Sequence, residues 1–176
     1  DRVERGATTN LLAQRDVDLF TLEDGSLGHA GLGAAIGLKD RDGLRQAVKD
    51  GVIQAISSHH QPHEPDAKLA PFAATEAGIS SVELLLPLAL QLVSEGLLDL
   101  PTLLARLSCG PASALRLPAG RLAVGAPADL VLFEPQGSTL AGSSWFSRGR
   151  NCPFIGEQLP GKVRFTLVDG HISYRS

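Results

Sequence analysis

The sequence predicts an α/β protein in which helices come first and a small β module closes the chain. An apolar run over residues 52–56, bounded by Gly51, is typical of a buried strand, and it ends in a cluster of polar residues. From Gly120 onward, short apolar segments separated by turn signals replace the helical spacing of the middle of the chain. We therefore expect a first part over residues 1–118 and a C-terminal β module over residues 119–176.

Composition narrows the class of protein. The 176 residues suffice for one ordinary domain, and 43% hydrophobic with 20% charged residues is typical of a soluble globular chain. A net charge of -3 gives no basic footprint, so we do not expect nucleic acid as a partner. The apolar run at 84–92 contains Pro87 and is too short to span a membrane. Cys109 and Cys152 form no spaced pattern, which fits a reducing, cytoplasmic location.

The N-terminal elements are weakly patterned. Residues 1–20 predict irregular or weakly helical structure, without the apolar run of a signal peptide, and the chain contains no Met, so we expect a piece of something longer. Residues 24–38 are glycine-rich and predict a loop; a phosphate-binding loop would need a Lys-Ser/Thr ending and a preceding strand. Residues 39–50 have the apolar spacing of an amphipathic helix that ends at Gly51.

The middle of the chain is predicted to be helical. A polar loop over 64–77 precedes a long apolar helix over 79–93, with Ser80 or Ser81 as its N-cap. Two shorter helices follow, over 102–107 after Pro101 and over 111–115.

The C-terminal module is predicted to consist of short strands. Asp169-Gly170 is a strong hairpin signal, and Glu134-Pro135 also suggests a turn. We expect Trp145 and Phe146 to pack beneath the module. The expected strands span residues 121–125, 128–133, 162–168 and 171–174.

His59, His60 and His63 form the one concentrated titratable cluster, at the C-terminal end of the expected strand 52–56. Neutral imidazole is a common zinc ligand, so either a metal site or a polar loop without metal fits this cluster. His59 and His63 have ligand-like spacing, whereas His60 should point to the other side of a continuing strand. A catalytic zinc uses about three protein ligands, and the cluster offers two comfortably.

Other candidate groups have plainer interpretations. Ser57 and Ser58 precede histidines, but no Gly-x-Ser-x-Gly elbow of a serine hydrolase is present. We expect Cys109 to be a small packed residue at a helix end rather than a nucleophile. We expect His29 and His171 to be isolated surface or turn residues. The carboxylates near the cluster are expected to be solvated loop residues; they are Glu64, Asp66 and Glu76.

Several segments together resemble the dihydroorotase family of amidohydrolases. Residues 55–63, Ala-Ile-Ser-Ser-His-His-Gln-Pro-His, resemble its Ile-Ala-Thr-Asp-His-Ala-Pro-His signature at the end of the eighth barrel strand. Pro71-Phe72 and the Gly-Ile-Ser-Ser-Val-Glu of residues 78–83 resemble its Pro-Phe and Gly-Ile-x-Gly-Leu-Glu segments. Residues 120–135 are similar to the Gly-x-Leu-x-x-Gly-x-x-Ala-Asp-Leu-Val-Leu-Phe-Asp-Pro motif, and residues 147–154 to Ser-Lys-x-x-Asn-Thr-Pro-Phe.

The resemblance implies part of a TIM-type (β/α)8 amidohydrolase barrel over 1–118. A small β-sandwich module, built in the family from the chain termini, would include 119–176. The first barrel strand, with its His-x-His zinc motif, has no counterpart in this chain. Residues 16–38 faintly resemble a mid-barrel stretch, and about two further strands of the family have no counterpart between Leu38 and Lys39. We therefore expect segments of the barrel to be missing before residue 1 and between residues 38 and 39.

The chain departs from the family pattern at positions where active members carry catalytic and metal-binding residues. Where active members carry an aspartate that serves as metal ligand and catalytic base, this chain has His59. His63 keeps the family's substrate-contacting histidine, whereas Gln61 replaces an alanine and Gly110 replaces the asparagine of Ser-x-Asn-Pro-Ala. The region matching the family's mid-barrel metal histidine, residues 12–15, has none.

The sequence is consistent with two alternative functions. The pattern resembles the non-catalytic dihydroorotase homologue that accompanies aspartate carbamoyltransferase, which implies a structural subunit of a homo- or hetero-oligomer in pyrimidine biosynthesis. In that case no residue is catalytic, no cofactor is expected, and His59, His60 and His63 are the remains of a site. The alternative is an active zinc-dependent cyclic amidohydrolase that uses His59 and His63 as altered metal ligands.

Overall fold

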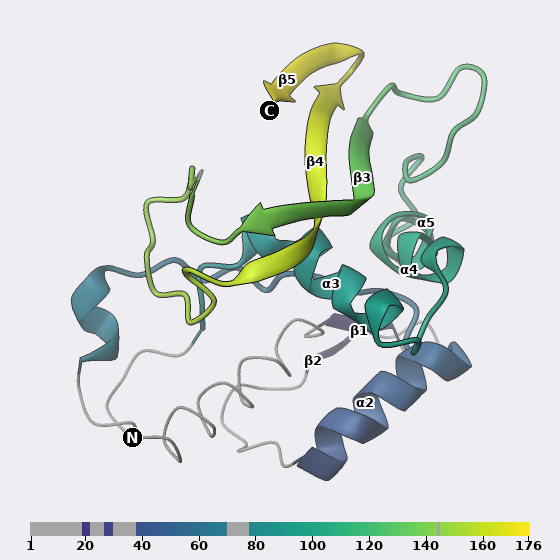
Figure 1. Ribbon diagram of the computed structural model, residues 1–176. Coiled ribbons are helices and arrows are strands. Elements are labelled where there is room, and N and C mark those ends of the chain that lie inside the picture. The colour runs from purple at the N-terminus through teal and green to yellow at the C-terminus, as the bar shows by residue number, and fades with distance from the viewer. Residues whose placement is uncertain (1–18, 22–26, 30–37, 70–77, 144) are drawn as a thin grey trace.

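The computed structural model describes residues 19–21, 27–29, 38–69, 78–143 and 145–176 (Figure 1). Its helices and strands confirm the order of a helical part followed by a β module. The helices are α2 (Leu38–Asp50), the 3-10 turns η2 (Pro65–Lys68) and η4 (Val82–Leu84), α3 (Leu85–Ser94), α4 (Leu100–Leu107) and α5 (Cys109–Ala114). The strands are β1 (Leu19–Thr21), β2 (Leu27–His29), β3 (Leu130–Leu140), β4 (Gln158–Val168) and β5 (His171–Arg175).

The helices with strong local signals form where the sequence predicts them. Helix α2 ends at Asp50, and Gly51 follows with the positive φ of 83° that suits glycine. The predicted helix over 102–107 is α4, which starts two residues earlier because Asp99 caps it by accepting a hydrogen bond from the Thr102 backbone N–H at 2.8 Å. Helix α5 begins at Cys109, two residues before its predicted start. Among the described residues, no helix is long and apolar enough to cross a membrane.

The long helix predicted over 79–93 is shorter than expected. Its regular part is α3, preceded by the single turn η4, so residues 79–81 are not helical. The backbone groups of these residues form hydrogen bonds with other segments. The Ile79 carbonyl accepts from Gln61 N at 2.8 Å, and Ser80 N donates to the Asn151 carbonyl at 3.3 Å. The Ser81 side chain does not cap the turn, because its hydroxyl donates to the Ser58 carbonyl at 2.7 Å.

The strand predicted over 52–56 is absent, and this prediction was wrong. Ile53, Ala55 and Ile56 are 3–5% exposed, so the expectation of burial is confirmed for them, whereas Val52 is 38% exposed. The backbone of the segment bonds to helices instead of strands: Ile53 N donates to the Ala47 carbonyl at 3.1 Å and Ile56 N to the Arg106 carbonyl at 3.0 Å. A strand is defined by its neighbours, and no strand in the described part of the chain lies against this one.

The N-terminal predictions lie largely outside the described residues. Within the regions predicted as irregular and as a loop, β1 and β2 form an antiparallel pair in which Leu19 lies opposite His29. His29 is therefore in a strand and not in a turn. Helix α2 runs through the junction of residues 38 and 39. The omitted barrel segments and the division at residue 118 remain predictions.

The β module is an antiparallel sheet of order β3-β4-β5. The Asp169-Gly170 hairpin is confirmed, with positive φ at both residues (48° and 78°), as a tight primed turn requires. The strand predicted over 121–125 is wrong: it is an exposed turn region. Glu134-Pro135 does not end a strand, because β3 continues to Leu140 through a register shift that tolerates the missing proline N–H.

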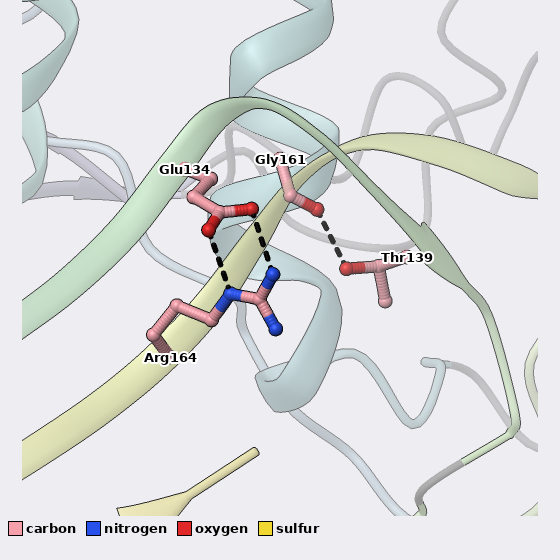
Figure 2. A network of polar contacts seen from close by, with 4 residues as sticks. All are labelled: Glu134, Thr139, Gly161 and Arg164. Atoms are coloured by element: carbon pink, nitrogen blue, oxygen red, sulfur yellow. Dashed lines mark hydrogen bonds and ion pairs between the residues drawn. The ribbon is translucent and has the colours of Figure 1, made fainter.

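An ion pair and a hydrogen bond link β3 and β4 on either side of this irregularity (Figure 2). Arg164 donates to both carboxylate oxygens of Glu134, at 2.9 and 3.0 Å. This hydrogen bonding lowers the pKa of Glu134, and Glu134 in turn raises the pKa of Arg164. Both groups are solvent-exposed, so the ion pair adds little to the free energy of unfolding. Its main effect is to fix the register of β3 against β4. The Thr139 hydroxyl donates to the Gly161 carbonyl at 2.6 Å beyond the shift.

Two hydrophobic clusters support these elements. The first joins α2, α3 and α4 around Val48, Leu90 and Leu103. The second lies between the start of α3 and the loop that joins β3 to β4, and it contains Leu84, Leu88, Ala141, Phe154 and Leu159, with Trp145 and Cys152 at its edge.

Two residues predicted to pack lie on the surface instead. Phe146 is 72% exposed, so the prediction that it packs beneath the module is wrong, although its ring meets the edge of Tyr174 at a centroid distance of 5.8 Å. Trp145 does pack against the second cluster, as expected. Cys109 is exposed, not packed, although Ala112 in the same helix is buried.

Gly161 allows β4 to pass close over α3. It has a positive φ of 85° and is buried, and a Cβ at this position would overlap the Cδ1 methyl of Leu90. Leu90 is 3% exposed in the first cluster and has little freedom to move aside. The absence of a side chain at Gly161 therefore helps to set the distance between the sheet and the helices.

We expect Gly161→Ala to lower the free energy of unfolding by about 1–3 kcal/mol more than Gly156→Ala, because only the first overpacks the core. Gly156 is the matched control, since it has a similar positive φ of 88° and a Cβ added there would meet no heavy atom within 4 Å. Urea unfolding of the two variants measures the difference. Equal losses would mean that backbone strain alone explains both.

Candidate functional site

Three segments meet just after residues 52–56. They are the histidine loop (57–64), the segment that enters η4 (78–84) and the loop between β3 and β4 (145–154). The polar groups of the three segments bond mainly to one another. The site therefore depends on contacts between residues far apart in the sequence.

The imidazole of His60 caps the turn η4. Its Nδ1 atom accepts hydrogen bonds from the backbone N–H groups of Ser81 at 3.0 Å and Val82 at 3.1 Å. An acceptor Nδ1 assigns the proton of the neutral ring to Nε2, which lies 3.4 Å from the Ser147 hydroxyl. His60 thus performs the task of a serine or aspartate N-cap, and both of its ring nitrogens face protein partners.

His59 and His63 lie in the same loop with different surroundings. His59 has a φ of 43°, in the left-handed region that few residues other than glycine, asparagine, aspartate and histidine occupy. The backbone of His63 is fixed by its N–H, which donates to Asn151 Oδ1 at 2.7 Å. All three imidazoles are partly buried. Within the described part of the chain, no group of three or more His, Cys, Asp or Glu residues is placed to hold a metal ion.

Asn151 joins the three segments through one buried side chain that is 6% exposed. Besides accepting from His63 N, its amide Nδ2 donates to the Gln61 carbonyl at 2.9 Å and to the Gly78 carbonyl at 3.3 Å. These bonds satisfy backbone groups on both sides of the site, including an acceptor on a buried glycine. The amide therefore fixes how the histidine loop sits against the entry to η4.

Glu83 fixes the third segment. Its Oε1 atom accepts from the backbone N–H groups of Phe146 at 2.9 Å and Ser147 at 2.6 Å. Ser147 Oγ then lies 2.9 Å from Ser80 Oγ and accepts from Gly149 N at 3.2 Å. The carboxylate is used to hold a loop and is not directed toward the histidines by any of these bonds.

Glycines allow the segments to touch. A Cβ on Gly149 would lie 2.5 Å from Pro62 Cβ and 2.7 Å from its Cα, and one on Gly78 would overlap the side chain of Gln61. Both glycines are buried. The histidine loop is therefore packed against backbone on two sides.

The position that carries asparagine in the family motif is equally closed. A Cβ on Gly110 would overlap the Gln54 carbonyl oxygen and would lie 2.9 Å from the Ala105 carbonyl oxygen. Both are backbone atoms, so no rotation of a side chain relieves the overlap. Helix α5 packs so tightly against residues 52–56 that only glycine fits at position 110.

The remaining candidates do not join this site. Glu64 and Asp66 are exposed, as expected of loop carboxylates, and His171 is exposed beside its own turn. Glu76 lies outside the described residues. Ser57 Oγ is buried and has no hydrogen-bond partner among the described residues, so none of them is an adjacent base of the kind a nucleophilic serine requires.

Sequence reasoning finds the histidine loop but misses the residues that organise it. Glu83, Ser147 and Asn151 all lie in segments that resemble the dihydroorotase family, and that resemblance is the available signal. Their roles come from contacts spanning 63 to 90 positions, which periodicity and spacing do not reveal.

The comparisons with known proteins identify the family. The model of the amidohydrolase family matches residues 33–173, so the chain belongs to that family. Its curated relatives include a dihydroorotase-like protein of Pseudomonas putida, 78% identical over 136 residues, and a dihydroorotase of Syntrophotalea carbinolica, 43% identical over 137 residues. Each match covers 77% of this chain and 32% of the relative, so the chain spans about a third of their length.

Solved structures show the same fold. A D-hydantoinase matches 93% of this chain and 34% of its own, with a TM-score of 0.73 at 23% identity. The inactive dihydroorotase-like domain of the Chaetomium thermophilum CAD-like multifunctional protein matches 77% of this chain and 36% of its own, with a TM-score of 0.54 at 21% identity. The chain is therefore a portion of the α/β barrel fold of amidohydrolases, and its likeness to dihydroorotases is confirmed at the level of the family.

We expect Asn151→Ala to destabilise the protein by at least about 2 kcal/mol, because each buried group left without a partner costs about 1–3 kcal/mol. Ser138→Ala is the control, since it removes an exposed hydrogen bond to Gln158 and should change stability by less than about 0.5 kcal/mol. Hydrogen exchange should also become faster at His63 N in the first variant alone. Unchanged exchange at His63 would contradict the bridging role of Asn151.

Proposed function

We propose that this chain is part of a catalytically inactive dihydroorotase-like subunit. Its role is structural, in a cytoplasmic assembly with the catalytic chain of aspartate carbamoyltransferase in pyrimidine biosynthesis. The observation that carries the proposal is the use of His60, whose ring caps η4 through two backbone N–H groups and faces Ser147 with its other nitrogen. We infer that the histidine loop stabilises the fold at the positions where the family resemblance implies catalytic and metal-binding residues.

The loss of the carboxylate supports an inactive subunit. The resemblance places the family's metal-binding catalytic base at the position of His59. A positioned acid–base group typically contributes about 10²–10⁴-fold to a rate, and ring opening or closure of a cyclic amide needs a proton delivered to the leaving nitrogen. Glu83 Oε1 accepts from the backbone N–H groups of Phe146 and Ser147. This oxygen therefore holds the loop and does not replace the missing catalytic carboxylate.

The described donors do not fit a catalytic zinc. With the His60 ring in its capping position, His59 and His63 are the imidazoles left in the loop, and a catalytic zinc uses about three protein ligands. Gly110 adds a second obstacle, because the asparagine that the family motif has at this position would overlap the Gln54 backbone. Reversion of the drifted site would thus require movement of α5.

The alternative is an active zinc-dependent cyclic amidohydrolase with His59 and His63 as altered ligands. It is favoured by relatives that bear the name dihydroorotase at 43% identity. The inactive subunit is favoured by the fold that this chain shares with the Chaetomium domain, whose name describes it as inactive and dihydroorotase-like. Zinc and turnover measurements separate the two functions.

We expect the purified full-length protein that contains this chain to hold less than about 0.1 zinc per subunit and to close carbamoyl aspartate no faster than the heat-inactivated sample, for want of three ligands and a base. His59→Asp alone, and His59→Asp with Gly110→Asn, should not restore turnover. Stoichiometric zinc with robust, chelator-sensitive ring closure by the unmutated protein would establish the alternative.

We expect the same full-length protein to bind the catalytic chain of aspartate carbamoyltransferase. Binding to the folded transferase stabilises it by mass action, so its Tm should rise with subunit concentration. Size-exclusion chromatography with light scattering, with and without the subunit, measures assembly. A transferase of unchanged size and Tm, which never co-purifies with the subunit, would contradict the structural role but leave the zinc result intact.

A further inference from the structure

The side chain of Gln61 is enclosed between two of the segments that form the candidate site. Gln61 belongs to the histidine loop and is half-buried, whereas its neighbour Pro62 is exposed. The family motif has an alanine at this position, so this chain adds a longer side chain that ends in a carboxamide. The added atoms must be accommodated within the site.

The backbone of Gln61 is fixed on both sides. Its N–H donates to the Ile79 carbonyl at 2.8 Å, and its carbonyl accepts from Asn151 Nδ2 at 2.9 Å. Ile79 is 3% and Asn151 is 6% exposed, so both partners are themselves held in the packed interior. The Cβ atom of Gln61 therefore has a defined position against the segment 78–84, and only the side-chain torsions are left to vary.

The side chain of Gln61 lies across Gly78. A Cβ built on Gly78 would stand 2.5 Å from Gln61 Cβ and 2.7 Å from its Cδ, and it would overlap the amide oxygen Oε1. The contact therefore extends from the first carbon of the side chain to its carboxamide. Gly78 is buried and has a positive φ of 94°, which suits glycine, so no side chain at this position competes for the space.

We propose that the carboxamide of Gln61 occupies space in which a small amide or ureide would lie, so that a residue of the histidine loop closes the site. A carboxamide presents a carbonyl acceptor and N–H donors in one plane, as an amide or ureide ligand does. Gln61 precedes His63 by two positions, and His63 is the histidine to which the family resemblance assigns the substrate contact. The proposal rests on the dihydroorotase-like site in the proposed function, but not on the absence of zinc or on the transferase.

A side chain that fills a site competes with any free ligand. The ligand binds only the fraction of molecules in which Gln61 has left Gly78, and the apparent Kd is the intrinsic Kd divided by that fraction. The two backbone hydrogen bonds and the close contact with Gly78 favour the closed position. An open fraction below about one in ten corresponds to binding that is weakened at least about 10-fold.

The test compares Gln61→Ala with Gln54→Ala in the purified full-length protein that contains this chain. Gln54 is the matched control, because its side chain is exposed and lies outside the histidine loop. Isothermal titration measures the binding of dihydroorotate and of carbamoyl aspartate, a cyclic and an open ureide. Succinate is the third probe, because it has two carboxylates, as carbamoyl aspartate has, but no amide.

We expect both ureides to bind Gln61→Ala at least about 10-fold more tightly than the unmodified protein, and Gln54→Ala to match the unmodified protein within about 3-fold. The affinity for succinate should be the same in all three proteins. Gln61→Met should remain closed, since methionine keeps the length of the side chain and fills the same space.

A second measurement does not depend on a folded variant. In the spectrum of the unmodified protein, nuclear Overhauser cross-peaks should join the side-chain amide protons of Gln61 to the α protons of Gly78. These cross-peaks report the closed position directly, and they decide the proposal if Gln61→Ala fails to fold.

Three results would overturn the proposal. Gln61→Ala could bind the two ureides no more tightly than the unmodified protein does. Gln54→Ala could gain as much affinity, or succinate could gain as much as the ureides. The cross-peaks between Gln61 and Gly78 could be absent. Each result would leave the proposed function standing, because the zinc and transferase measurements test that function separately.

Discussion

The buried amide of Asn151 is the contact on which the arrangement of the site depends. It reaches one backbone N–H and two backbone carbonyls, on the histidine loop and on the residue before Ile79. The Asn151 carbonyl in turn accepts from Ser80 N, which keeps residues 79–81 out of the helix. Because this segment is not helical, the N–H groups of Ser81 and Val82 are left for His60 to cap. The positions of the turn η4 and of the imidazole therefore both depend on one residue, through its side chain and its backbone carbonyl, which lies 88 residues beyond His63.

The parts of the fold that are predictable depend on local interactions. Helix α2 and the Asp169-Gly170 hairpin follow from apolar spacing and from the φ values that their turn residues allow. The composition of segment 52–56 identifies it as buried, but its strand character requires a neighbour that the pattern does not reveal. At Glu134-Pro135 the turn signal is genuine, yet pairing with β4 extends the strand through a bulge. At both segment 52–56 and Glu134-Pro135, tertiary contacts and not local propensity decide the secondary structure.

The sequence predicts where the candidate site lies but does not predict the role of its residues. Three histidines in five positions identify a polar cluster, and family resemblance identifies which of its neighbours matter. Whether an imidazole binds metal or caps a helical turn depends on which backbone N–H groups reach its lone pair. For His60 those groups come from residues 81 and 82, in a segment with its own constraints. Spacing along the chain carries no information about that contact.

If the chain is part of an inactive subunit as proposed, the glycines around the site explain why the catalytic residues would be hard to regain. Once a position needs no side chain, neighbouring backbone can close over it and gain contact area, and the packed interior then resists refilling. Gly110 lies against the carbonyl of Gln54, just before the histidine loop, and Gly149 lies against Pro62 within it. Each close approach stabilises the loop in its structural role. Each also removes the space that a ligand-orienting side chain would need. In the proposed inactive subunit, this packing favours the structural role of the loop, and the capping bonds of His60 are one contact through which it stabilises the fold.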